Sequence, residues 1–163
     1  MRSAIFFVFL SSNLCAQSIF WISGDPHCKS MMNNGAVEKL ISLNGDSLAV
    51  GVTLSESSGM LDAWVAVVSQ TTALNIDPSN VSLHILTPAE KQIAPIAEWK
   101  LNSLRIGNKV RLRKTVVPAG GTASGYVLFP NEKKRERILV EVPLGDTLFV
   151  FPFDFAKGSK DGK

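Results

Sequence analysis

The amino-acid sequence predicts an all-β protein, an antiparallel sandwich of about seven to nine short strands. Large apolar residues alternate with small or polar ones in several stretches, and this period-two pattern is typical of strands with one buried face. Turn signals rich in Gly, Pro, Asn and Asp separate these stretches. No helical pattern alternates with them, so the sequence argues against an α/β fold.

The first predicted strands form a hairpin followed by a central strand. Residues 37–43 and 48–56 flank Asn44-Gly45-Asp46, and Asn-Gly readily takes the positive φ angles of a tight turn. In residues 61–68 apolar side chains occupy both faces, which predicts a strand in the middle of a sheet.

The middle of the chain is less regular. A turn over residues 77–80 precedes a short strand over 81–86. Residues 87–108 are interrupted by Pro88 and Pro95 and fit neither strand nor helix period. We expect this stretch to contain one short helix that crosses between the sheets.

The last third of the chain returns to strands. Basic and apolar residues alternate over residues 109–113 and lead to the turn at 118–121. Strands are predicted at 125–129, 138–144 and 147–155, with a charged turn after the first. The last strand carries four phenylalanines on one face, each of which can bury about 150–250 Å². They are Phe149, Phe151, Phe153 and Phe155.

Residues 1–16 have the layout of a secretory signal peptide. Arg2 supplies a positive start, residues 4–10 are an unbroken apolar run, and a short polar exit follows. The run is too short for a bilayer span, which needs about 20 residues. We therefore expect export to the periplasm or the cell exterior. Lipid anchoring at Cys15 is not expected, because Asn13-Leu14 replace the small residues that usually precede such a cysteine.

The remaining organisation follows from this export signal. Residues 17–36 are expected to be an N-terminal arm or loop, residues 37–155 the sandwich, and residues 156–163 a disordered tail. The chain of 163 residues is 45% apolar with a net charge of +3. That small surplus argues against nucleic acid as a partner. The mature chain contains no second long apolar segment, so the sequence predicts no transmembrane span in it.

One block of the sequence resembles secreted bacterial immunoglobulin-like domains, including small extracellular antigen-like proteins of unassigned function. It runs from Thr115-Val116-Val117-Pro118 through a glycine-rich turn to Gly125-Tyr126-Val127-Leu128-Phe129-Pro130. Trp64-Val65-Ala66-Val67 and the Asp77-Pro78 turn lie upstream of it. The resemblance covers roughly residues 46–155 and implies an immunoglobulin-like sandwich. These families share no catalytic site, so the resemblance assigns no functional residue.

A cluster near the predicted N-terminus of the mature chain suggests metal chemistry. It gathers imidazole, thiol and thioether groups, which suit copper or zinc, in His27, Cys28, Met31 and Met32. The spacing matches no paired Cys or His signature of zinc, and His84 is the only other histidine. The alternative interpretation is a loop before the sandwich in which the methionines fill a gap. We therefore assign no metal site and no cofactor.

Catalytic patterns are weak. Cys28 beside His27 suggests a thiol nucleophile, but catalytic partners usually come from distant positions. The sequence contains no Gly-x-Ser-x-Gly elbow, no phosphate-binding loop and no His-Glu-x-x-His. Single carboxylates near predicted turns are expected to bond their own backbone, among them Asp46, Asp62, Asp77 and Asp146. The sequence thus predicts that the protein is not an enzyme.

Two groups of basic residues suggest a contact surface. The first lies on one predicted strand face and the second in or beside a later turn, and if close together they form one positive patch. The alternative is that they only solvate an outer face and block edge pairing. The groups are Lys109, Arg111 and Arg113, and Lys133, Lys134, Arg135 and Arg137. A glycosylation sequon at Asn80-Val81-Ser82 is expected to be unused.

Taken together, the sequence predicts a non-enzymatic exported domain that binds a protein or cell-envelope partner through its loops or basic face. The alternative function is a periplasmic copper or zinc carrier that uses His27, Cys28, Met31 and Met32.

Overall fold

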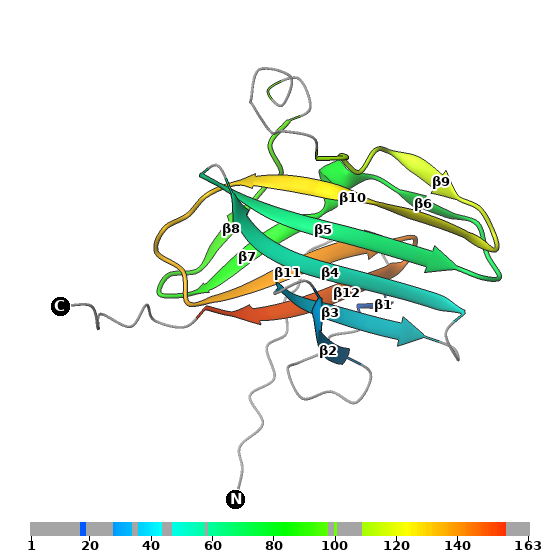
Figure 1. Ribbon diagram of the computed structural model, residues 1–163, viewed down its shortest axis with the longest axis horizontal. Helices are drawn as coiled ribbons and strands as arrows, with labels where there is room; N and C mark the ends of the chain where they lie inside the picture. The colour runs from blue at the N-terminus through cyan, green and yellow to red at the C-terminus, as the bar shows by residue number, and fades with distance from the viewer. Residues whose placement is uncertain are drawn as a thin grey trace, which may run out of the picture.

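The structure, a computed structural model, describes residues 17–18, 28–33, 36–43, 47–57, 59–97, 100 and 109–155 of the 163-residue chain. These residues form two five-stranded sheets that pack face to face, with a third sheet of two short strands beside them (Figure 1). The predicted all-β sandwich is confirmed. Within this part of the chain, no helix is long and apolar enough to cross a membrane.

Sheet B lies in front in Figure 1 and carries the surface described below. Its strand order is β10-β5-β4-β3-β2, all antiparallel. The strands are β2 (Cys28–Asn33), β3 (Ala36–Leu43), β4 (Leu48–Ser57), β5 (Met60–Ser69) and β10 (Gly121–Pro130).

Sheet A lies behind it in the order β1-β12-β11-β7-β8, with β1 parallel to β12. Its strands are β1 (Gln17–Ser18), β7 (Ser82–Thr87), β8 (Lys91–Ile93), β11 (Arg137–Leu144) and β12 (Thr147–Asp154). Sheet C pairs β6 (Leu74–Ile76) with β9 (Thr115–Val117). A 3₁₀ turn, η1 (Pro78–Asn80), joins β6 to β7.

The core forms because the alternating residues of both sheets face inward together. On β5 every second residue is fully buried from Leu61 to Val67, while Trp64 on the opposite face is half-buried. On β12 three phenylalanines enter the core and Phe155 packs against it half-buried. The predicted central strand and the predicted phenylalanine face are therefore confirmed.

The expected crossover helix is only partly described. Residues 91–93 form strand β8, which pairs with β7. The chain then reaches sheet B, where the Ile96 N–H donates to the Leu128 carbonyl at 2.8 Å. Lys100 is helical and donates its N–H to the Ala97 carbonyl. The rest of the stretch up to residue 108 lies outside the described residues.

Other expectations fall at the ends of the chain. The stretch 17–36, expected as an arm or loop, contains the edge strands β1 and β2. The proposed signal peptide at 1–16, the turn at 44–46 and the tail at 156–163 lie outside the described residues. The turn between β11 and β12 is as predicted, and Gly145 takes a φ of 56° there, which favours glycine.

Candidate functional site: a basic ridge beside strand β10

Residues 109–116, which we call the basic ridge, run beside the outer edge of β10 and lead into β9 of sheet C. The segment was expected to be a regular strand through residue 113, and the structure corrects this. Its only bridge to β10 pairs Arg111 with Tyr126 in parallel, and the chain then leaves β10 to form β9. The ridge contains four cations and no acidic residue, in the sequence Lys-Val-Arg-Leu-Arg-Lys-Thr-Val.

The ridge approaches β10 closely because of a glycine. A Cβ atom on Gly125 would meet the backbone of the ridge, with Arg111 C and Leu112 Cα both at 2.6 Å. This approach lets Leu112 enter the core, where it is 6% exposed. It also lets Tyr126 exchange backbone hydrogen bonds with Val110 and Leu112, at 2.9 and 3.0 Å.

We predict that Gly125→Ala displaces the ridge and lowers the free energy of unfolding by about 1–3 kcal/mol, since the clash is with backbone atoms. Urea unfolding followed by tryptophan fluorescence measures this loss. Ser124→Ala, at the exposed neighbouring position, is the control and should change stability by less than about 0.5 kcal/mol. Equal stability of the two variants would contradict this account of the close approach.

One end of the ridge is fixed by a buried ion pair. The Lys109 side chain passes over the Tyr126 ring, with Nζ 5.1 Å from the ring centroid, and pairs with the Asp62 carboxylate on β5. Asp62 is fully buried and also accepts a hydrogen bond from Ser57. A buried carboxylate is strongly unfavourable without such a partner, so the pair holds the ridge to sheet B.

This ion pair corrects one expectation. We expected Asp62 to be a turn carboxylate that bonds its own backbone, but it lies inside β5 and contacts the side chains of Ser57 and Lys109. Its position at the start of an apolar run was a signal that a partner exists. The partner itself could not be inferred, because Lys109 lies 47 residues away.

The other end of the ridge is fixed at the surface. Lys114 Nζ lies 2.8 Å from Asp77 Oδ2. Asp77 also caps η1 by accepting hydrogen bonds from the backbone and side chain of Ser79, so the expected bond to its own backbone turn is confirmed. The Lys114 ammonium, followed by the Ser79 donors, lowers the pKa of Asp77 to about 2. The same contact raises the pKa of Lys114.

This lowered pKa predicts a pH dependence. Because the folded pKa lies below the ordinary value of 3.8, the charged Asp77 stabilises the fold above about pH 4, and this contribution is lost as the pH falls towards 2. Asp77→Asn keeps the capping oxygen but removes the charge. We expect the difference in unfolding free energy between wild type and this variant to be constant above about pH 4 and to disappear near pH 2. A difference that persists unchanged at pH 2 would contradict the assignment.

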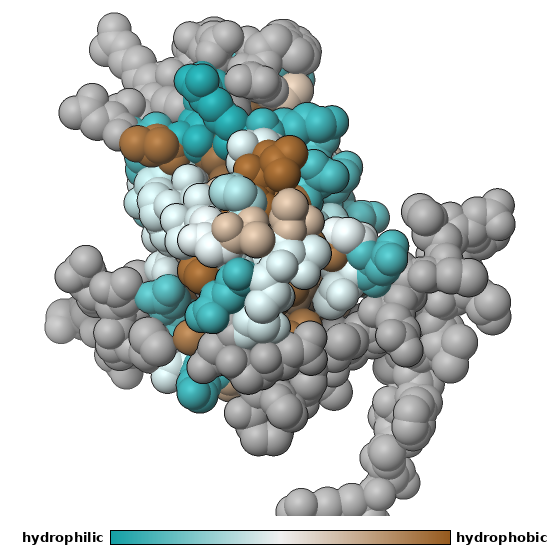
Figure 2. Space-filling view, turned by 90° about the vertical axis from the view of Figure 1, so that its right-hand side faces the viewer, coloured by the Kyte–Doolittle hydropathy of each residue, from teal (hydrophilic) through white to brown (hydrophobic). Residues whose placement is uncertain are grey.

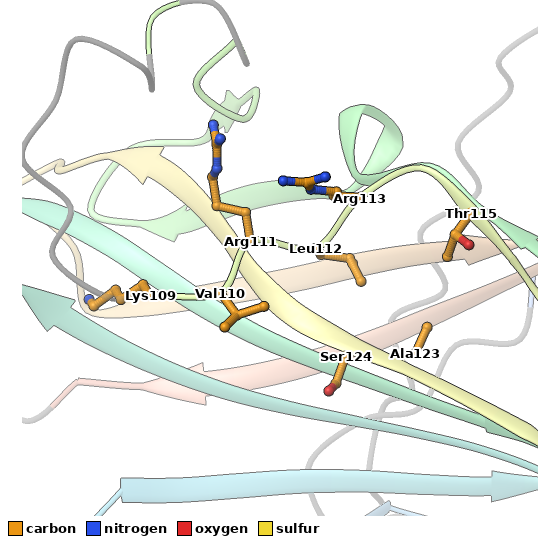
Figure 3. A pocket seen from close by; sticks show the side chains of 8 residues that line it. All are labelled: Lys109, Val110, Arg111, Leu112, Arg113, Thr115, Ala123 and Ser124. Carbon is orange, nitrogen blue, oxygen red and sulfur yellow. The ribbon is translucent and has the colours of Figure 1, made fainter.

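The ridge exposes apolar side chains between its cations. Val110 is 68% exposed and Val116 is 57% exposed, the two largest values among the exposed large hydrophobic residues of the described chain. Figure 3 shows the Arg111 side chain rising from the ridge and the Arg113 side chain pointing towards it, while Val110 and Leu112 point away from both. Figure 2 faces the end of the sandwich where β9 lies and shows hydrophobic residues at the surface beside hydrophilic ones.

Three surface hollows border this one segment. The first has a volume of about 540 Å³ and lies between the ridge and β10 at Ala123 and Ser124 (Figure 3). The second, of about 610 Å³, lies between the ridge and residues 94–97. The third, of about 630 Å³, lies between β9 and the turns at Asp77 and Gly145. Residues of the ridge therefore line all three of these hollows.

The second basic group, at residues 133–137, includes two arginines that form ion pairs within the fold. Arg135 is largely buried against the Phe155 ring and donates to Glu56 on β4, which lowers the pKa of Glu56. Arg137 pairs with Asp154 at 2.6 Å. Arg135 thus joins the β10–β11 connection to β4 and Arg137 joins β11 to β12, whereas Lys133 and Lys134 are exposed.

The suggested metal cluster is described only in part. Cys28 begins β2 and packs against the core cluster. His27 and the side chains of Met31 and Met32 lie outside the described residues. Within the part of the chain that is described, no three His, Cys, Asp or Glu side chains gather around a position that could hold a metal ion.

A second polar group lies on the outer face of sheet A. His84 Nε2 lies 3.2 Å from Glu141 Oε2, and Ser82 donates to the same carboxylate oxygen at 2.9 Å. The carboxylate therefore lies between the hydroxyl and the imidazole. Ser82 is also the third residue of the sequon, whose Asn80 is exposed on η1.

The comparisons with known proteins add no relative. No known protein family and no curated protein sequence matches this chain.

Proposed function

We propose that this protein is a non-enzymatic binding domain whose contact surface is the basic ridge. The observation that carries the proposal is that one segment without acidic residues exposes two valines, includes two arginines and borders three hollows. Arginine is enriched at protein interfaces, and the buried centre of an interface is more apolar than the rest of the surface. Interspersed cations speed the association with an acidic partner.

The contacts of the described polar groups support a role without catalysis. Ser57 donates to Asp62, and the same carboxylate also pairs with Lys109. Ser82 donates to Glu141 and not to His84. An activated serine instead donates to a base that a third group orients.

The proposal places the domain outside the cytoplasm. Its support is the signal-like order of residues 1–16, and the resemblance to exported immunoglobulin-like domains agrees with it. In such domains the sandwich supplies a rigid support and its surface segments make the contacts. The ion pairs at Lys109 and Lys114 fix the two ends of the ridge in the same way.

Site-specific photo-cross-linking in the cells that make the protein tests the proposal. A photoreactive residue replaces Val110 on the ridge or, as the matched control, Val68, which is 37% exposed on β5. We expect a discrete cross-linked product from position 110 and little or none from position 68. Equal products from both positions, or none from position 110, would contradict a binding role for the ridge.

A further inference from the structure

The edge of β10 beside the ridge presents unpaired backbone groups. Tyr126 donates its N–H to Val110 and accepts from Leu112, and the Leu128 carbonyl accepts from Ile96. Alternate residues of a strand present their backbone groups to the same edge. The N–H and C=O groups of Thr122 and Ser124 therefore point to this edge as well. Within the described ranges, no backbone group pairs with them there, because the chain has left β10 to pair β9 with β6.

The first hollow lies along this open edge. Its walls are Ala123 and Ser124 on β10 and five residues of the ridge segment 109–113, with Thr115 closing one end (Figure 3). Its volume is about 540 Å³. Ligand clefts typically have volumes of about 300–1,000 Å³. Both Arg111 and Arg113 line the hollow, and none of the described residues that line it is acidic.

We propose that this hollow binds an extended acidic peptide segment, which adds as a short strand to β10 at Thr122 and Ser124. Backbone hydrogen bonds at the open edge would hold the main chain, as in other cases of strand addition. Carboxylates of the segment would face Arg111 and Arg113, whose guanidinium groups suit carboxylate geometry. Small apolar side chains would contact Val110. This inference rests on the proposed function and names the class of its partner.

Open strand edges are usually blunted by charge, and the cations of the ridge could serve only that purpose. Two observations favour a ligand instead. The cations stand on a separate segment across a hollow and not on β10 itself, where Thr122 and Ser124 are uncharged. Val110 is also exposed at the same hollow, and an apolar side chain does not discourage association.

The test uses a blocked peptide in which glutamate alternates with valine, titrated into the full chain by calorimetry. The control peptides replace glutamate by lysine or carry N-methyl groups on alternate amides. We expect the acidic peptide to bind and to slow hydrogen exchange of the Ser124 and Thr122 amides. N-methylation of the peptide amides and replacement of its glutamates by lysine should each weaken binding at least about tenfold. The first removes backbone hydrogen bonds and the second removes the carboxylate contacts. Equal binding of the N-methylated peptide would overturn strand addition.

Variants of the edge give an independent readout. Ser124→Pro removes the edge N–H but no bond to β5, a position where proline is tolerated, and should weaken peptide binding at least about tenfold. Ser124→Ala is the matched control and should bind like the wild type. If the proline variant does not fold by circular dichroism, the N-methylated peptide decides alone.

The outcomes separate this inference from the proposed function. A cross-linked product at position 110 together with no binding of the acidic peptide would refute the acidic peptide but keep the ridge as a contact surface. Equal binding of phosphatidylglycerol vesicles to the wild type and Ser124→Pro, with no protection of Ser124 by the peptide, would assign the ridge to a lipid surface and refute strand addition.

Discussion

Lys109→Met is expected to lower the free energy of unfolding by about 3–5 kcal/mol, because it leaves the buried Asp62 carboxylate without its counter-ion. Asp62 has no exposed surface, and its Oδ1 atom finds no hydrogen-bond partner within the described part of the chain. Water therefore cannot replace the lost ammonium without opening the sheet. The free energy of unfolding of a domain is usually about 5–15 kcal/mol, so this loss would be a large part of it.

Two matched variants identify the cause. Lys91→Met removes the exposed ion pair to Glu132 and should cost at most about 1 kcal/mol. Asp62→Leu combined with Lys109→Met removes both charges and should recover most of the stability, since a buried pair can often be replaced by apolar residues. Urea unfolding of the variants measures these values. A cost of Lys109→Met no larger than that of Lys91→Met would show that the buried pair does not hold the ridge.

The second large effect is expected in the core. Phe151→Ala should lower the free energy of unfolding by about 3–5 kcal/mol, because a fully buried aromatic side chain is lost and a cavity remains. Phe151 lies in the middle of β12 opposite Val140 of β11 and belongs to the core cluster between the two sheets. Thermal unfolding by circular dichroism measures the effect.

Val110→Ala is the control for this variant. Val110 is 68% exposed, so its truncation should change stability by less than about 0.5 kcal/mol. A small effect of Phe151→Ala would contradict the two-sheet packing. A large effect of Val110→Ala would mean that this valine supports the fold and not a contact.

The fold could be predicted from the sequence because its signal is local. In β5 and β12 every second residue is apolar from Leu61 to Val67 and from Phe149 to Phe153, and this repetition indicates which face is buried. The hairpin of β3 and β4 and the turn at Gly145 follow from neighbouring residues in the same way. Such patterns indicate strands and their inner faces, but not which strands pair.

The ridge could not be predicted because its structure depends on distant contacts. Val110 and Leu112 occupy equivalent places in the alternating pattern, yet one is exposed and the other is in the core. The difference arises where the segment crosses Gly125 and leaves β10. Lys109 belonged to the expected basic face, but the structure turns it to Asp62 on β5. Arg111 and Arg113 were part of the expected basic face, whose contact role stays a prediction, while the hollow that they line was not foreseen.

The most direct measurement of the central claim compares two charge reversals of equal size. Arg111→Glu with Arg113→Glu alters the ridge, and Lys133→Glu with Lys134→Glu alters exposed lysines of the β10–β11 connection. The yield of the photo-cross-linked product at position 110 is measured in both folded variants. We predict that the yield of the cross-linked product falls about tenfold or more in the ridge variant and changes less than about twofold in the lysine variant, because binding depends on local charge complementarity. Equal losses would show that net charge alone attracts the partner and would contradict a specific ridge surface.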